Sequence, residues 1–291
     1  MKQLALTTAI AASLLTGNAL AATIDGALGS DPYGAPLFVQ DSSTSFGDNT
    51  DGSSLFANGS EIDSVYGEIS SGNLNLLVAG NLETNFNRLV LFFDTGAGGQ
   101  NTLDGSTGGP FPSFSGTVFD AGFDADYALL FNGGNAGPEY FLDFAAIGGA
   151  SSFLGGSGSG NQILNGSNGI IVGFDQSNVA GVTSSSAAGA AGVTTGFEFQ
   201  IPLSVIGSPT GSIDVAGFIA GSGGGFVSSQ VIGGGFGVVS DNSNHAGNSP
   251  DFTQVAGNQF VTVNAVVPEP MSATLALATL ALSAGVRRRK D

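Results

Sequence analysis

The sequence contains no cysteine and no tryptophan, and charged residues make up only 10% of its 291 positions. Without cysteine the fold cannot depend on disulfides, and a body of this size does not require them, since it can bury a large core. A zinc site needs several histidine or cysteine ligands, and His245 is the sole histidine. A catalytic triad would also depend on His245, which lies in a polar loop sequence and is expected to be solvated. The composition therefore excludes thiol and zinc chemistry.

Basic residues are almost confined to the two ends of the chain. Five of the six fall in the terminal segments: Lys2, Arg287, Arg288, Arg289 and Lys290. Between residues 23 and 267, 21 acidic residues face one basic residue, Arg88, which gives this part a formal net charge of −20. Nucleic acid is excluded as a partner because phosphate contacts are made chiefly by Lys and Arg. Repulsion in such a body is eased by screening salt or by bound divalent cations, and calcium is the cation that this charge suggests.

Residues 1–22 have the pattern of a secretory signal peptide. Lys2 is followed by an apolar run over residues 4–15, and Ala19 and Ala21 supply small residues two positions apart. Such a segment is removed on export, so we expect cleavage after Ala21 or Ala22. The alternative interpretation is a first helix of the fold.

The last 24 residues, 268–291, contain three parts in order. Pro268-Glu269-Pro270 is followed by an uncharged stretch over residues 271–286 and then by the cationic cluster at 287–290. As a helix, the uncharged stretch spans about 24 Å, short of the roughly 30 Å of a hydrocarbon core, so it is a marginal membrane anchor. Cationic residues stay on the cytoplasmic side, which places everything before Pro268 across the membrane. The proline pair favours extended backbone that a protease can engage, and the alternative is a permanent tail anchor.

This order of parts resembles the PEP-CTERM sorting signal of Gram-negative bacteria. In that family the tail carries a Pro-Glu-Pro motif, a short transmembrane helix and a terminal Arg cluster, and an exosortase, which is a membrane cysteine protease, recognises it. The resemblance implies that Pro268, Glu269 and Pro270 are the sorting motif, that residues 287–290 are a membrane-stop cluster, and that exosortase is a partner. It also implies a cell that makes exopolysaccharide, and thus a location at the cell surface or in the extracellular matrix.

Between the two ends, the sequence predicts an all-β body over residues 23–267. Short apolar runs alternate with clusters of Gly, Asn, Ser and Asp, and no helical periodicity extends beyond one turn. This spacing predicts a two-sheet antiparallel β-sandwich, jelly-roll-like, with Phe as the main large core residue. A β-solenoid is the alternative, but the sequence has no fixed repeat period. The clearest strands are expected at residues 74–79, 88–94, 126–131, 140–144, 170–174, 197–201, 213–220 and 259–264.

Local patterns add four more specific predictions. Residues 89–93 are apolar on both faces, which indicates a central strand that is covered on both sides. Apolar and polar residues alternate over 197–201, which predicts a half-exposed sheet with Glu198 and Gln200 on the exposed face. A short helical turn is expected between Pro202 and Gly207. Small-residue loops are expected at residues 148–160 and 181–192.

Parts of the body also resemble known sandwich proteins. Residues 80–83 leading into 89–94, and residues 123–127, 177–182 and 257–260, are similar to a group of PEP-CTERM proteins. Residues 196–202 together with Gly207 are similar to the closing strands of DOMON-like and family-nine carbohydrate-binding sandwiches. The second resemblance implies sugar or cofactor binding.

The densest group of carboxylates in the body is Asp120, Asp124 and Asp126. Two of them lie on one face of a strand edge if the strand begins at Asp124, and hard oxygen ligands at that spacing suit Ca²⁺. The alternatives are solvated turn carboxylates, caps that accept hydrogen bonds from backbone N–H groups, and a glycosidase pair. Arg88, a lone cation before an apolar strand, is expected to form a structural ion pair with a carboxylate.

The sequence therefore predicts a non-enzymatic, exported β-sandwich that serves as a surface or biofilm-matrix component, with Ca²⁺ as its candidate ligand. One rival is a carbohydrate-binding module for the cell's own exopolysaccharide. The other is a carboxylate-based hydrolase, which would show two close acids in a cleft.

Overall fold

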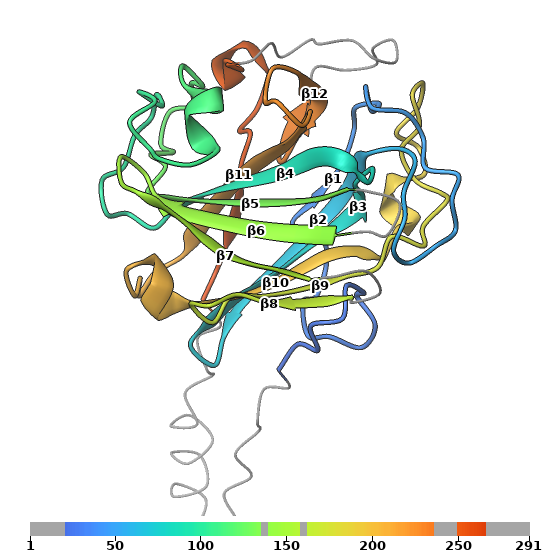
Figure 1. Cartoon of the computed structure of the whole chain (residues 1–291), viewed down its shortest axis with the longest axis horizontal. Coiled ribbons are helices and arrows are strands. Elements are labelled where there is room, and N and C mark those ends of the chain that lie inside the picture. The colour runs from blue at the N-terminus through green and yellow to red at the C-terminus, as the bar shows by residue number, and fades with distance from the viewer. Residues whose placement is uncertain (1–20, 135–138, 158–161, 236–248, 266–291) are drawn as a thin grey trace, which may run out of the picture.

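The computed structural model of the chain describes residues 21–134, 139–157, 162–235 and 249–265. It is all-β, with two antiparallel sheets, and is consistent with the predicted sandwich (Figure 1). Helical structure within the described residues is limited to four short 3-10 turns.

The first sheet has six strands in the order β1-β2-β3-β10-β9-β8. These strands are β1 (Phe38–Val39), β2 (Glu61–Ser70), β3 (Asn73–Asn81), β10 (Gly196–Pro202), β9 (Ile171–Phe174) and β8 (Ile163–Asn165). Ser71 and Gly72 join β2 to β3, and both have positive φ, as the favoured two-residue hairpin turn requires. β10 then pairs with β3, so this sheet brings early and late parts of the chain together.

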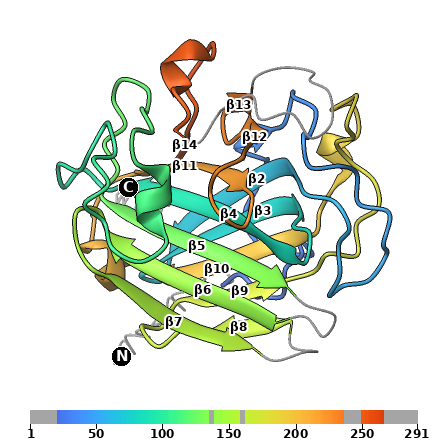
Figure 2. The same ribbon diagram turned by 45° about the horizontal axis from the view of Figure 1, so that its top comes forward.

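The second sheet has eight strands in the order β13-β12-β11-β4-β5-β6-β7, with β14 also paired to β11. These strands are β13 (Gly234–Gly235), β12 (Val227–Val231), β11 (Ile213–Ala220), β4 (Asn85–Asp94), β5 (Tyr127–Gly134), β6 (Glu139–Ala146), β7 (Ser151–Ser157) and β14 (Val261–Val263). Strands β4 to β7 form an antiparallel meander. Figure 2 shows this meander lying across β10, β9 and β8 of the first sheet.

Two apolar cores hold the sheets in place. The larger lies between the sheets and includes Leu76 of β3, Leu91 of β4 and Phe199 of β10, all fully buried. The second lies on the outer face of the second sheet, where Phe92 of β4 packs against the ring of Phe119 with a centroid distance of 5.1 Å. Of the twelve largest fully buried side chains, eleven are Phe, which confirms Phe as the main large core residue.

All eight predicted strands are present, as β3, β4, β5, β6, β9, β10, β11 and β14, with bounds that differ by a few residues. The central-strand prediction is confirmed, since β4 lies between β11 and β5 and its two faces contribute to the two cores. The helical turn is also confirmed, as the 3-10 turn Leu203–Ile206, which ends at Gly207 in left-handed backbone. The loop expected at 148–160 is partly wrong because β7 occupies residues 151–157, where backbone pairing with β6 makes a strand of small residues.

The described body begins and ends against the same strand, β2. Ala22 packs with Tyr66 of β2 and Leu77 of β3, and Ala265 forms a parallel bridge with Ile69 of β2. The first residue of β2, Glu61, is eight positions before Ile69, or about 26 Å along an extended strand. The loops around Glu61 therefore lie far from Ala265, the last described residue.

Candidate functional site

The three predicted calcium ligands have separate hydrogen-bonding arrangements. Asp126 accepts hydrogen bonds at Oδ2 from Thr95 N at 2.7 Å and from Ala97 N at 3.1 Å. Asp120 accepts one at Oδ2 from Gln259 N at 2.6 Å. Asp124 is exposed. For Asp120 and Asp126 these contacts match the alternative in which carboxylates cap backbone N–H groups, and calcium binding at the three residues stays a prediction.

Arg88 lies half-buried at the start of β4, on the outer face of the second sheet. Burial lowers the pKa of its guanidinium, while the charge of Asp143 on β6 raises it. In return, burial raises the pKa of the Asp143 carboxyl and the charge of Arg88 lowers it. Arg88 Nη1 also donates a hydrogen bond to Ser113 Oγ at 3.5 Å. Asp143 is therefore the carboxylate on which the charge of Arg88 acts, and the structural ion pair stays a prediction.

The targeting residues lie mostly outside the described part of the chain. This applies to Pro268, Glu269 and Pro270, to the cationic cluster at 287–290, and to residues 1–20. Within the described ranges, no helix has the length and apolar character needed to cross a bilayer. Ala22 is 8% exposed, and Thr23 N donates a 2.7 Å hydrogen bond to Asp31 Oδ1. A chain cleaved after Ala21 would keep both the buried Ala22 side chain and the hydrogen bond between Thr23 and Asp31.

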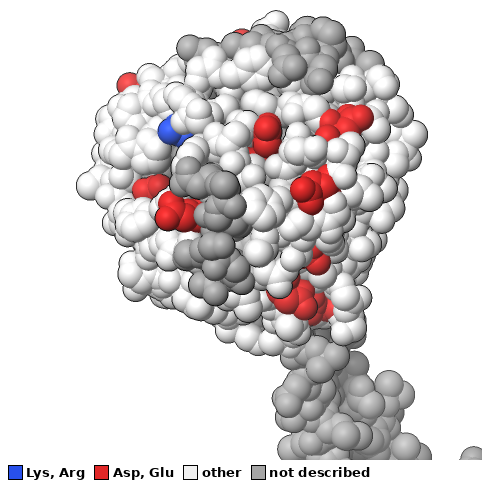
Figure 3. Space-filling view, turned by 45° about the vertical axis from the view of Figure 1, so that its right-hand side comes forward, with Lys and Arg blue, Asp and Glu red and all other residues white. Residues whose placement is uncertain are grey.

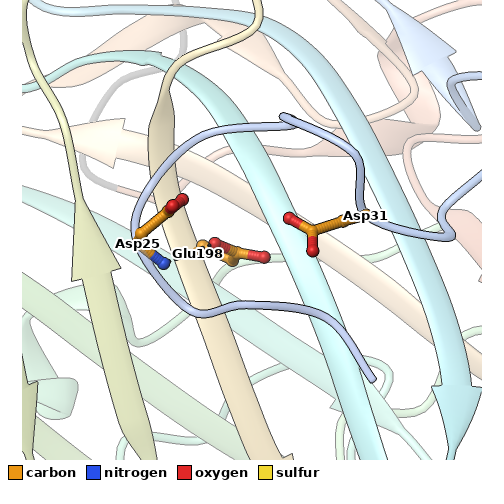
Figure 4. Close-up of side chains that lie close together, drawn as sticks. All are labelled: Asp25, Asp31 and Glu198. Carbon is orange, nitrogen blue, oxygen red and sulfur yellow. Dashed lines mark hydrogen bonds between the residues drawn. The ribbon is translucent and has the colours of Figure 1, made fainter. Parts of the chain in front are cut away.

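Three carboxylates that the sequence does not suggest as a group meet on the first sheet (Figure 4). Their ligand oxygens, from Asp25, Asp31 and Glu198, all lie within 4.8 Å of one another. Glu198 comes from β10 and is fully buried, whereas Asp25 is exposed and Asp31 is half-buried. The prediction that Glu198 lies on an exposed face is wrong, because the N-terminal loop with Asp25 and Asp31 crosses that face.

Hydrogen-bond donors occupy both carboxylate oxygens of Glu198. Oε1 accepts a hydrogen bond from Tyr33 Oη at 2.6 Å, and Oε2 accepts two, from Asp25 N at 2.9 Å and Gly26 N at 3.1 Å. Burial raises the pKa of Glu198 to about 7, and these hydrogen bonds act in the opposite direction. The cluster therefore ties the N-terminal loop to β10.

A second pair of carboxylates lies at the start of β2. Glu61 is 2% exposed and Asp63 is 0% exposed. The register with β3 shifts between Ile62 and Ser64, which marks a β-bulge. The core-facing residues Ile62 and Val65 are consequently three positions apart, and Asp63 and Ser64 both lie away from the inter-sheet core.

Each of these two acids has one bonded oxygen and one oxygen without a partner. Asp63 Oδ1 accepts a 2.7 Å hydrogen bond from Val182 N, and Glu61 accepts one from the backbone of Asn49. Glu61 Oε2, Asp63 Oδ2 and Ser64 Oγ are buried and have no hydrogen-bond partner in the described structure. Because the large majority of buried polar atoms in proteins are hydrogen-bonded, three such oxygens within four residues are unusual.

The electrostatics of this pair are unfavourable. Burial raises the pKa of Glu61 well above its ordinary value, and the charges of Asp63 and Asp48 raise it further. Burial also raises the pKa of Asp63 to about 7. Arg88 is the only basic side chain in the described ranges, and the carboxylate on which its charge acts is Asp143. Among the described residues, the pair therefore has no basic side chain to neutralise it.

Two loops, residues 41–60 and 175–193, cover the start of β2. Thr44 N donates to Thr183 O at 3.1 Å, and Asn49 Nδ2 donates to Gln176 O at 3.3 Å. Ser184 N donates to Asp48 Oδ1. Figure 1 and Figure 2 both show the two loops side by side, in blue and yellow. The loops are thus bonded to each other and, through Asn49 and Val182, to the two acids.

The sequence was also compared with protein-family models, with curated proteins and with solved structures, and none of the three comparisons found a match. The resemblance of the tail to a sorting signal therefore depends on the tail residues alone. The distribution of charge and the geometry of the described body are the observations that bear on function.

Proposed function

We propose that the chain is an exported, non-enzymatic sandwich protein, jelly-roll-like, of the cell surface or extracellular matrix of a Gram-negative bacterium, sorted through its tail by an exosortase. The observation that carries this proposal is the charge distribution. Five of the six basic residues lie in the terminal segments, and the body between them has a net charge of −20. A cationic cluster is held on the cytoplasmic side of a membrane, whereas an acid-rich body without lysine is not.

The way the body joins the tail supports display at a surface. Ala265 pairs with Ile69, and the sorting motif begins only three residues later, at Pro268. A body attached through this tail would hold the far end of β2, with loops 41–60 and 175–193, away from the membrane. Among the described residues on the face in Figure 3, acidic side chains are spread over the surface and basic ones are scarce. Such a surface suits a salt-rich medium, where screening reduces the repulsion.

The burial of the clustered acids supports a non-enzymatic role. A carboxylate hydrolase must bring two acids against the scissile bond of its substrate. Glu198, Glu61 and Asp63 are each at most 2% exposed, so a polysaccharide chain cannot reach them without displacing the loops above.

A topology reporter tests this proposal. Alkaline phosphatase, which is active only outside the cytosol, would be inserted between residues 267 and 268 of the full chain, and a second fusion would lack residues 1–22. We expect phosphatase activity from the first fusion and none from the second. Equal inactivity of both, with a fluorescent reporter at the same position active in the cytosol, would refute export.

Glycan binding is a second candidate function, favoured by an aromatic group on the outer face of the second sheet. The ring of Phe141 lies 6.4 Å from that of Phe86 and 6.3 Å from that of Phe153, which is 60% exposed. An exposed aromatic ring such as that of Phe153 is suited to stacking on the apolar face of a sugar.

A pull-down with the cell's exopolysaccharide distinguishes this candidate. Phe153→Ala should reduce binding at least about threefold if stacking contributes on the order of 1 kcal/mol. Val179→Ala, at a residue that is 57% exposed in loop 175–193, is the matched control and should bind normally. Equal binding by both variants and the parent chain would show that this face of the second sheet does not bind the exopolysaccharide.

A further inference from the structure

We infer that Glu61, Asp63 and Ser64 form a binding site for one Ca²⁺ ion, enclosed by loops 41–60 and 175–193. The inference goes beyond the proposed surface role and does not depend on it, because export and cation binding can each fail alone. It also concerns residues other than Asp120, Asp124 and Asp126, which the sequence favours.

The start of β2 supplies three oxygen ligands. Glu61 Oε2, Asp63 Oδ2 and Ser64 Oγ are buried without hydrogen-bond partners in the described structure. The bulge in β2 removes Asp63 from the strand's ordinary alternation and places it next to Ser64, away from the inter-sheet core. Ca²⁺ prefers oxygen ligands, and carboxylates are combined with neutral oxygens in its sites. An ion there would satisfy three atoms that the protein leaves unsatisfied.

The negative charge of the two acids has no basic side chain among the described residues to balance it. Two ionised carboxylates buried together cost several kcal/mol each unless something neutralises them. Lysine does not occur in residues 23–267, and Arg88 is the only arginine there. One divalent cation would neutralise both acids at neutral pH.

Loop 175–193 approaches Asp63 closely. Gly181 has φ of +121°, and a Cβ on it would lie 2.2 Å from Asp63 Oδ1. The following residue, Val182, donates its N–H to that same oxygen. The loop therefore fixes Asp63 with one oxygen bonded and leaves the second available to an ion.

The enclosure favours Ca²⁺ over Mg²⁺. Mg²⁺ demands a near-ideal octahedron and usually keeps several of its waters, whereas Ca²⁺ accepts irregular sets of protein oxygens. A site whose oxygens are all buried is better suited to Ca²⁺, because Mg²⁺ usually keeps several of its bound waters. Bound Ca²⁺ would strengthen the link between both loops and β2, at the end of the strand that is far from Ala265.

Thermal unfolding of the full chain tests the inference, in 150 mM NaCl with EDTA, with excess CaCl₂ or with excess MgCl₂. We expect CaCl₂ to raise the unfolding midpoint by about 3 °C or more over EDTA, and MgCl₂ to raise it by clearly less. The double variant Glu61→Gln, Asp63→Asn should lose the Ca²⁺ effect. The control variant Asp25→Asn, Asp31→Asn, in the more exposed acidic cluster, should keep it.

Three results would overturn the inference. They are no Ca²⁺ effect on the parent chain, equal effects of Ca²⁺ and Mg²⁺, and a Ca²⁺ effect that survives in the double variant. If the double variant does not fold, calorimetric titration of the Ser64→Ala variant with CaCl₂ measures the affinity and the stoichiometry of Ca²⁺ binding instead. An affinity at least about fivefold weaker than that of the parent, with one ion bound per chain, supports the site, and an unchanged affinity refutes it.

Discussion

The hydroxyl of Tyr33 donates a 2.6 Å hydrogen bond to Oε1 of Glu198, a residue 165 positions further along the chain. Tyr33 is 6% exposed and Glu198 is 0% exposed, so neither can replace the other with water. With the backbone N–H groups of Asp25 and Gly26 on the other oxygen, this bond holds the first loop of the body on β10. The point at which the mature chain would begin is therefore tied to the middle of the first sheet.

Removing the hydroxyl should destabilise the fold. We expect Tyr33→Phe to lower the free energy of unfolding by about 2 kcal/mol, because it leaves Glu198 Oε1 buried without a donor. Tyr66→Phe is the matched control, since Tyr66 lies in the same apolar cluster and is 4% exposed. Urea unfolding measures both changes, and equal losses in the two variants would contradict the role given to the Tyr33 hydroxyl.

Stability should depend on the protonation of Glu198. Its pKa is raised to about 7 in the folded chain, so the folded state holds this proton more tightly than the unfolded state does. Its contribution is therefore fully present below about pH 4.5 and is lost as the pH rises through about 7, a change on the order of 1 to 2 kcal/mol after allowance for solvent screening.

The variant Glu198→Gln isolates this effect, because Asp63 titrates in the same window and acts in the same direction. Unfolding midpoints would be measured from pH 4.5 to pH 8 for both chains. The difference between the parent and the variant should favour the parent most at low pH and shrink toward pH 8. A pH-independent difference would show that Glu198 keeps an ordinary pKa.

A side chain at position 181 should disturb the covering loop. Gly181→Ala must place a Cβ against Asp63 Oδ1 at a backbone angle that L-residues rarely adopt, which predicts a loss of about 2 kcal/mol or more. Gly192→Ala, in the same segment, has nothing within 4 Å of the added Cβ and should change stability by less than about 0.5 kcal/mol. Similar unfolding midpoints for the two variants would show that Gly181 of loop 175–193 is not in close contact with Asp63 of β2.

Arg88 should stabilise the sheet through Asp143. We expect Arg88→Met to lower the unfolding midpoint, since Asp143 is half-buried and loses its counter-charge. A double-mutant cycle with Asp143→Asn should give a coupling energy of about 0.5 to 1 kcal/mol. An unchanged midpoint in Arg88→Met, or zero coupling, would remove the predicted ion pair.

The strands could be predicted where apolar residues alternate or run together, as in β4 and β10. β2 could not, because Glu61, Asp63 and Gly67 interrupt its apolar residues and the bulge breaks its period of two. A bulge is a property of pairing with β3, and a single strand's sequence does not reveal it. The buried carboxylates of β2 were missed for the same reason.

The error at Glu198 has a different origin. Alternation correctly separates Phe197 and Phe199, which face the inter-sheet core, from Glu198 on the opposite face. It cannot say what covers that opposite face. The cover is the loop around Asp25 and Tyr33, more than 160 residues earlier in the chain, and long-range contacts of this kind leave no periodic signal.

The intact mass of the protein recovered from the native cell envelope or medium shows whether the chain is exported and sorted through its tail. Export with sorting predicts a chain that begins at Ala22 or Thr23 and that has lost its tail near Pro268. Recovery of the uncleaved chain of 28.7 kDa from the cytosol would contradict both export and sorting.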